Sequence, residues 1–253
     1  MAILFSGDFH ANSQKELSNI TKREILARFG KDLFAEIKYH VILGDGGFLW
    51  PGNERGDNYN YRTLAFRPFP VLCVIGNHDP VLGRTDLREV DIGIGNTVYQ
   101  INEVPFVAYL KRGKIYTMDN HEFLVLGGAL SIDKFLRTPD RNWWKQEYWS
   151  EEEKEAVLHL LDNRDTFDYV LSHTGPERIN KLLFVSALGK YAKKFTDEVG
   201  LLNDTIDGKI NCRQWFCGHW HKDNYYYDEM LKRRYQYLYD SLALLKEDEI
   251  LIR

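Results

Sequence analysis

The strongest constraint in this sequence is a pattern that recurs along the chain. A short apolar run ends next to a glycine that is accompanied by a carboxylate, an amide or a histidine. The pattern occurs in AILFSGDFH, YHVILGDGG, PVLCVIGNHD, FDYVLSHTGP and QWFCGHWH. Such a run is typical of a buried strand that emerges at a site. Because ligands of an open α/β sheet collect beyond the carboxyl ends of its strands, the repeated layout indicates a functional site there.

The polar residues at these strand ends form a mixed set of nitrogen and oxygen donors. The candidate residues are Asp8, His10, Asp45, Asn77, His78, Asp79, His173, His219 and His221. Carboxylates, imidazoles and an amide oxygen suit Mn, Fe, Zn or a related divalent ion. A single histidine at a strand end is more often structural than catalytic. Clusters at the ends of five apolar strands favour a metal site instead.

The last cluster, CGHWHK, places two histidines two positions apart. Residues i and i+2 of a strand point to the same face. The spacing therefore predicts that His219 and His221 share one face and that Trp220 packs on the opposite side. Taken alone, a polar strand edge is the simpler interpretation of this pair.

The remaining elements follow from periodicity and capping. Apolar residues at four-residue spacing predict a helix over 21–38. Ser150 followed by acidic residues predicts a helix that begins there, because serine caps the helix and acids favour its first turn. We also expect strands at 106–110, 114–118 and 122–130, a helical stretch over about 176–203, and a β-meander over 214–245.

Composition narrows the class of protein. The chain has 253 residues, of which 44% are hydrophobic and 28% charged, which suits one large domain over residues 1–253. Its net charge of -4 does not indicate extended nucleic-acid binding or a membrane-surface protein. Three cysteines without a C-x-x-C pair favour the reducing cytoplasm. The N-terminus lacks a basic region, and its apolar run is too short for a signal peptide or a membrane span.

In chain order, the motifs are D-x-H, G-D, G-N-H-D, a lone H and G-H-x-H, and they span residues 7–221. This ordered set resembles the signature of the calcineurin-like metallophosphoesterase family. The resemblance implies an α/β fold, specifically a four-layer α/β/β/α sandwich. It also implies a dinuclear centre with two divalent metal ions per chain at one end of the sheets, and metal-dependent hydrolysis of a phosphate ester.

The resemblance also implies a role for each motif residue. One ion is assigned to Asp8, His10 and His221, the other to Asn77, His173 and His219, and Asp45 bridges the two. A metal-bridging hydroxide would attack phosphorus in line. His78 would stabilise charge or protonate the leaving oxygen, with Asp79 orienting it. The alternative is that His78 only caps a turn.

Two features depart from relatives of this kind. Many carry a second acid three residues after the bridging aspartate, whereas this chain has Phe48. The difference leaves the ligand set intact and puts the tuning of the metals in doubt. The chain also lacks the GDxVDRG and RGNHE blocks of Ser/Thr protein phosphatases, so we do not expect it to belong to that subgroup.

Loops near the metal end are expected to select the substrate, a phosphorylated small molecule or a nucleotide. Segment 47–62 contributes Arg55 and Arg62 for a second phosphate. Segment 131–149 contributes Lys134, Arg137 and Arg141 beside Trp143 and Trp144, and such groups can bind a nucleotide by charge and stacking. The alternative is that the aromatic residues anchor the loop and the charges are solvated.

Several alternatives stay open. A nuclease or a nucleotide phosphodiesterase competes with a phosphatase within the enzyme class. A non-catalytic scaffold on the same fold would be expected to have lost ligands, which this chain has not. Residues outside the signature are expected to be structural: His40, His121 and His159, with Cys73 and Cys217 as packing residues.

Overall fold

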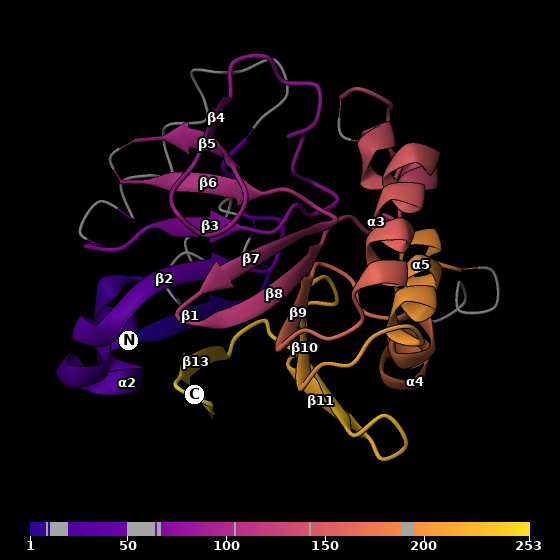
Figure 1. The fold of residues 1–253 in the computed structure, drawn as a ribbon. Helices are drawn as coiled ribbons and strands as arrows, with labels where there is room; N and C mark the ends of the chain where they lie inside the picture. The colour runs from indigo at the N-terminus through magenta and orange to yellow at the C-terminus, as the bar shows by residue number, and fades with distance from the viewer. Residues whose placement is uncertain are drawn as a thin grey trace.

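The computed structural model describes residues 1–8, 10, 20–49, 64, 67–103, 105–141, 143–188 and 195–253. Two mixed sheets face each other, and helices cover the outer face of each sheet (Figure 1). In this view α2 lies at the lower left, while α3, α4 and α5 lie together on the right. This arrangement is the predicted four-layer α/β/β/α sandwich.

The first sheet has eight strands in the order β14-β13-β1-β2-β3-β6-β5-β4. Their bounds are β1 (Ala2–Ser6), β2 (Ile37–Ile42), β3 (Val71–Cys73), β4 (Arg88–Val90), β5 (Val98–Asn102), β6 (Val107–Leu110), β13 (Leu242–Lys246) and β14 (Glu249–Ile252). Strands β1, β2, β3 and β6 run parallel to one another. The carboxyl ends of β1, β2 and β3 therefore meet at one edge of the sheet.

The second sheet has six strands in the order β11-β12-β10-β9-β8-β7. Their bounds are β7 (Lys114–Met118), β8 (His121–Leu126), β9 (Tyr169–Ser172), β10 (Gln214–Cys217), β11 (Asn224–Asp228) and β12 (Arg233–Tyr237). Strands β8, β9, β10 and β12 are parallel. His121, which we expected to be a structural residue, is the first residue of β8.

The β-meander expected for the C-terminal region is wrong. Strand β11 pairs with β12 but not with β10, and β10 and β12 are parallel neighbours. Strand β13 crosses to the other sheet and pairs with β1. The physical reason is burial, because residues 242–245 are buried on both faces of the strand and need a position inside the sandwich.

The helices follow their capping signals more closely. Helix α2 (Lys22–Glu36) begins after Thr21, whose hydroxyl accepts a hydrogen bond from the Glu24 backbone, and it ends before residues 37 and 38, which start β2. Helix α3 (Glu151–Asn163) has the predicted cap at Ser150, completed by Glu153 as a capping box. The helical stretch expected over 176–203 is divided into α4 (Glu177–Leu188) and α5 (Glu198–Asp207). None of the described helices is both long and apolar enough to cross a membrane.

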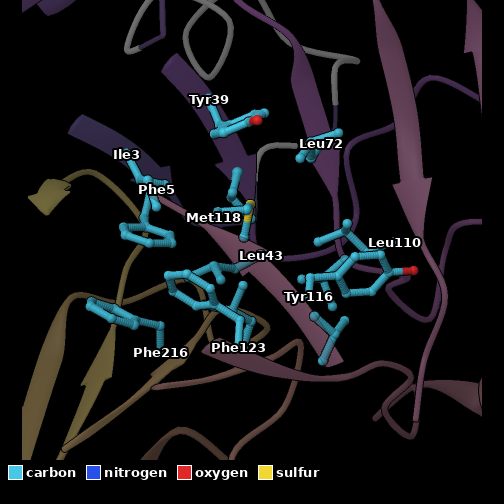
Figure 2. Packing of buried hydrophobic residues seen from close by; sticks show 14 of the residues in the cluster. Ile3, Phe5, Tyr39, Leu43, Leu72, Leu110, Tyr116, Met118, Phe123 and Phe216 are labelled. Atoms are coloured by element: carbon cyan, nitrogen blue, oxygen red, sulfur yellow. The ribbon is translucent and has the colours of Figure 1, made fainter. Parts of the chain in front are cut away.

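Three buried clusters fill the spaces between the four layers. Along β1, Leu4 joins a cluster with residues of α2, whereas Ile3 and Phe5 join a cluster between the two sheets. Figure 2 shows this central cluster, in which the rings of Phe5 and Phe216 stack across the sheets with centroids 4.7 Å apart. A third cluster lies between the six-stranded sheet and α3, α4 and α5. Burial of each such large side chain stabilises the fold by roughly 1.5–3 kcal/mol, which holds the two sets of strand ends together.

Candidate metal centre

The candidate site lies where the parallel strands of both sheets end. Asp8 follows β1, Asp45 follows β2 and Asn77 follows β3 in the first sheet. His173 directly follows β9 and His219 follows β10 in the second sheet. Distances between these side chains, given below, show that the two sets of strand ends meet.

Glycines permit this close approach. Gly44 has a φ of 90°, and a Cβ atom at this position would lie 2.2 Å from the Nδ1 atom of His173. A Cβ atom at Gly76 would lie 2.0 Å from Oδ1 of Asp45. A side chain at either position would therefore displace a candidate ligand. The glycines of the GDG and GNHD motifs are needed because the backbone itself packs against the donors.

The first group of donors contains Asp8, His10 and His221. The Nε2 atom of His10 lies 2.9 Å from Oδ1 of Asp8, and the Nε2 atom of His221 lies 3.1 Å from Oδ2 of the same carboxylate. The two Nε2 atoms are themselves 3.1 Å apart. Burial lowers the pKa of His10, but the charge of Asp8 outweighs this and raises it to about 10. Conversely, burial raises the pKa of Asp8, and His10 more than offsets this, holding the pKa well below its ordinary value.

The second group contains Asp45, His173 and Asn77. The Nε2 atom of His173 lies 3.3 Å from Oδ2 of Asp45 and 2.8 Å from Oδ1 of Asn77. On the other side of the ring, Nδ1 lies 2.8 Å from the carbonyl oxygen of Leu43 and donates to it. This contact sets the ring orientation and directs Nε2 into the site, as is common for histidines that bind metals.

Asp45 lies between the two groups. Its Oδ2 atom is 3.7 Å from Nε2 of His10 and 3.3 Å from Nε2 of His173. Its Oδ1 atom accepts a hydrogen bond of 2.7 Å from the backbone nitrogen of His78. Burial raises the pKa of Asp45, but His173 and His78 outweigh it and hold the pKa well below 3.8. An ionised carboxylate in this position is suited to bridge two cations.

His219 completes the set from the side of the second sheet. Its ring centroid lies 5.0 Å from that of His173. Its Nε2 atom is buried and has no hydrogen-bond partner in the described part of the chain. Burial lowers the pKa of His219 to about 3, so the ring is neutral. Buried donor atoms that lack protein partners fit the presence of divalent ions.

The histidine pair 219 and 221 does not lie on a strand. Strand β10 ends at Cys217, and both histidines have positive φ angles, 69° for His219 and 49° for His221. The predicted same-face geometry of a strand is therefore wrong, and a strained turn aims the two rings instead. The expectation for Trp220 is confirmed, because it is buried in the third cluster and stacks on Phe184 with centroids 5.0 Å apart.

His10 and Asp45 share this strained backbone conformation. Their φ angles are 37° and 50°, in the region that disfavours side chains with a Cβ. Each such residue costs of order 1–3 kcal/mol and persists only where the surrounding structure holds it. Together with His219 and His221, they make four of the nine non-glycine residues that have a positive φ in the described part of the chain.

His78 borders the donors, and both of its ring nitrogens face hydrogen-bond donors. Nη1 of Arg137 lies 3.1 Å from Nδ1, and Nδ2 of Asn77 lies 3.0 Å from Nε2. A neutral imidazole accepts at only one nitrogen, so one of these contacts is a close approach without a hydrogen bond. Burial lowers the pKa of His78, and the charge of Arg137 lowers it further.

Asp79 does not make the contact that the sequence suggested. Its buried carboxylate accepts hydrogen bonds from the backbone nitrogen of Gly76 at 2.9 Å and from the hydroxyl of Tyr109 at 2.8 Å. No hydrogen bond joins it to the His78 ring among the described residues, because the carboxylate turns back toward the sheet. Burial raises the pKa of Asp79 to about 6.

The predicted substrate residues have different outcomes. Arg137 lies beside His78 and also pairs with Asp133 at 2.5 Å. Lys134 is engaged within its own loop, because its ammonium donates to the Tyr148 hydroxyl at 2.8 Å and lies over the ring of Trp143. Arg55 and Arg62 lie outside the described residues.

The structure also accounts for other residues named from the sequence. Phe48, at the position of the second acid, is completely buried in the first cluster. His40 is buried, with Nε2 at 2.8 Å from Ser6 Oγ and Nδ1 at 2.6 Å from Arg67 Nη1. Its role is structural, as expected. Cys73 is buried as predicted.

Sequence reasoning missed three residues that support the donors. Ser131 accepts a hydrogen bond from Asn77 at 2.9 Å, and Glu147 accepts one from Ser131 at 2.9 Å. Tyr239 stacks on His221 with ring centroids 5.1 Å apart. All three lie outside the motifs, and only an unusually buried acid in a polar loop could have drawn attention to Glu147.

A buried set of carboxylate, imidazole and amide donors at the strand ends of an α/β/β/α sandwich is typical of a metal-dependent hydrolase. The model of the calcineurin-like phosphoesterase family matches residues 1–223, and the chain belongs to this family. It is accordingly a hydrolase that acts on phosphoric ester bonds.

Solved structures share the fold at low sequence identity. A dimetal phosphatase from Danio rerio has a TM-score of 0.54 and 12% identity, and the match covers 100% of this chain and 95% of that chain. Another crystal structure has a TM-score of 0.59 and 12% identity, and the match covers 100% of this chain and 98% of that chain. The comparison with curated proteins finds no match.

Proposed function

We propose that this hydrolase cleaves the ester bond of a phosphorylated small molecule or nucleotide at a dinuclear metal centre. The observation that carries the proposal is the pair of candidate ligand groups, Asp8 with His10 and His221, and Asp8 with Asp45 and His173. Within each group the ligand atoms lie within 4.8 Å of one another. Two adjacent groups of this kind can hold two ions close enough to act on one phosphate.

We assign the ligands of the two ions as follows. Asp8, His10 and His221 hold one ion, Asn77, His173 and His219 hold the other, and Asp45 bridges them. The position of Asp45 Oδ2, at 3.7 Å from His10 and 3.3 Å from His173, supports the bridging role. When bound, two divalent ions such as Mn, Fe or Zn bind phosphate oxygens and lower the pKa of water for in-line attack on phosphorus.

His78 is proposed to donate a proton to the leaving oxygen or to stabilise its charge. Nε2 of its ring lies 3.9 Å from Oδ2 of Asp45, so this nitrogen faces the metal centre. Arg137, at 3.1 Å from Nδ1, places a positive charge beside the ring that would offset negative charge on the leaving oxygen. Asp79 supports the turn through Gly76 and Tyr109 and does not orient the ring directly.

Arg137 is the best supported substrate residue. It is adjacent to His78, and its side chain is 21% exposed. Its guanidinium can donate two parallel hydrogen bonds to the oxygens of a phosphate. Lys134, Arg55 and Arg62 remain weaker proposals, because Lys134 contacts Tyr148 and Trp143 in its own loop and the two arginines lie outside the described residues.

We also propose that residues 1–253 act as one domain in the cytoplasm. Three apolar clusters that connect all four layers support a single domain. The free thiols of the three cysteines support a reducing compartment.

The proposal is tested with purified protein, added Mn, and a panel of aryl phosphate monoesters and diesters. We expect turnover by the wild type and loss of at least about 100-fold in an Asp45→Asn, His78→Ala double variant. Turnover no higher than that of the double variant would refute the proposal. The ratio of monoester to diester rates decides between a phosphatase and a phosphodiesterase or nuclease.

Metal analysis separates the enzyme from a non-catalytic scaffold. The proposal predicts about two ions per chain after Mn supplementation. Well below one ion per chain would favour the scaffold. Two tightly bound ions without turnover on any ester would contradict the catalytic role while leaving the metal site in place.

A further inference from the structure

Asn77 differs from the other proposed ligands in one respect. Its side-chain amide ends in an oxygen and a nitrogen of nearly the same shape, and only the oxygen can bind a cation. A rotation of the amide by half a turn would therefore present two N–H donors to the ions. In the structure, Oδ1 faces the site, at 2.8 Å from Nε2 of His173.

Two buried residues select this orientation. Nδ2 of Asn77 donates to the hydroxyl of Ser131 at 2.9 Å, and that hydroxyl donates to Oε1 of Glu147 at 2.9 Å. The other carboxylate oxygen, Oε2, accepts from the backbone nitrogen of Ser131 at 3.2 Å. All three side chains are buried, so water does not compete for these bonds.

The direction of the hydrogen bonds that join Asn77, Ser131 and Glu147 follows from the number of hydrogens available. The ionised form of Glu147, present above its pKa, only accepts, and the hydroxyl of Ser131 has a single hydrogen, which this carboxylate takes. The hydroxyl oxygen can then only accept from Asn77. If the amide rotated, Oδ1 would face the lone pairs of Ser131, and a buried polar contact worth about 1–3 kcal/mol would be lost.

The fold brings these residues together by close backbone packing. A Cβ atom at Gly127 would lie 2.7 Å from the carbonyl oxygen of Ile75, and one at Gly128 would lie 2.4 Å from the carbonyl oxygen of Glu147. The glycine pair thus lets the segment before Ser131 lie against both partners. Arg112 donates to the carbonyl oxygens of residues 146 and 148, on either side of Glu147.

Burial of the Glu147 carboxylate lowers the stability of the fold. Glu147 is 1% exposed, and no ion pair with it is found among the described residues. A buried carboxylate without a contacting cation destabilises the fold unless its hydrogen bonds compensate. Its two carboxylate oxygens accept from the hydroxyl and from the backbone nitrogen of Ser131, the residue that contacts Asn77.

We propose that Ser131 and Glu147 are positioning residues that hold Oδ1 of Asn77 toward the metal centre and thereby set the affinity of the ion that Asn77 binds. This inference rests on the proposed function in one point, the assignment of Asn77 as a ligand. Partners of this kind typically change metal affinity by about 10- to 100-fold.

The test measures metal affinity and does not depend on turnover. Metal-free wild type, Ser131→Ala and Glu147→Gln are titrated with Mn²⁺ by calorimetry, and with Co²⁺ by its visible absorption. We expect one of the two binding steps to weaken by about 10- to 100-fold in both variants, and the other step to change by less than about threefold.

A second ligand background provides the decisive comparison. In Asn77→Asp both terminal atoms are oxygens, so no orientation has to be selected. In the Asn77→Asp background, Glu147→Gln should change the metal affinity of either binding step by less than about threefold. In the wild-type background the same substitution should weaken one step by about tenfold or more. An equal loss in both backgrounds would overturn the proposal.

Glu153→Gln serves as the matched control. Glu153 pairs with Arg112 at 2.5 Å and so supports the same loop, but it takes no part in the hydrogen bonds that link Glu147 through Ser131 to Asn77. It should leave both binding steps unchanged, and a loss equal to that of Glu147→Gln would indicate a general effect of the loop. Ser131→Ala keeps the test decisive if Glu147→Gln fails to fold.

The titration also separates the two proposals. If the wild type binds no ions, the proposed function fails. If the wild type binds two ions and the variants bind them with unchanged affinity, only the positioning role is refuted.

Discussion

The substitution Gly76→Ala tests how tightly the structure confines the bridging carboxylate. The added Cβ would lie 2.0 Å from Oδ1 of Asp45 and 2.3 Å from its backbone nitrogen, although real contacts below 3.0 Å essentially never occur. Asp45 or the end of β3 must therefore retreat by about 1 Å. A misplacement of that size costs on the order of 10²-fold in rate, which corresponds to ~2.7 kcal/mol in activation free energy.

The protein should remain folded despite the crowding. Crowding of this kind costs about 1–3 kcal/mol, which most folded domains tolerate. We therefore expect Gly76→Ala to remain folded by circular dichroism and to lose about 100-fold in kcat/KM for an aryl phosphate with saturating Mn. Metal content is measured on the same samples, because a displaced Asp45 should also weaken metal binding.

The control is Gly208→Ala. A Cβ atom at Gly208, which caps α5 with a φ of -72°, would lie 3.7 Å from the carbonyl oxygen of Asp204, an ordinary contact. This variant should keep kcat/KM within about twofold of the wild type. If Gly76→Ala keeps more than half of the wild-type kcat/KM and both ions, the argument from close packing is refuted.

Three further predictions concern pH, packing and the histidine pair. Burial raises the pKa of Glu147 from 4.5 to about 7, so stability present below pH 4.5 is lost as the pH rises through 7. Between about pH 5 and pH 8, the free energy of unfolding of the metal-free wild type, measured with urea, should fall by ~3 kcal/mol more than that of Glu147→Gln. The same pH dependence of unfolding free energy in both proteins would contradict this. Trp220→Ala removes the ring stacked on Phe184 and should lower the free energy of unfolding by about 3–5 kcal/mol; a loss below about 1 kcal/mol would show that the ring is not packed as described. His219→Ala and His221→Ala should each deplete one ion preferentially in metal analysis, and equal loss of both ions from either variant would argue against separate duties.

Local sequence patterns predicted the elements that depend on nearby residues. The strand that ends before Asp8, the helix that begins near residue 21 and the capping box at Ser150 were all readable, because the interacting groups lie within a few residues of one another. The four-layer sandwich followed from the resemblance of the ordered motifs. Strands β4, β5 and β14 were missed, because they are short and partly exposed.

Long-range pairing corrected the expectations that local patterns could not decide. Whether β10 continues into a meander depends on partners far away in the chain, and β13 is drawn to β1, more than 200 residues earlier, by the need to bury both of its faces. The turn that carries His219 and His221 is likewise held by its surroundings and not by its own sequence preference.

The sequence by itself determined which donors this protein presents and in which order, because each donor directly follows a strand that its own apolar residues specify. Only the tertiary structure decided what holds those donors in place. Asn77 and Ser131 are 54 residues apart, and Asp79 turns to Tyr109 and away from His78. Contacts of this kind leave no periodic signal in the chain, because they arise only when two sheets pack and bring distant loops to the same edge.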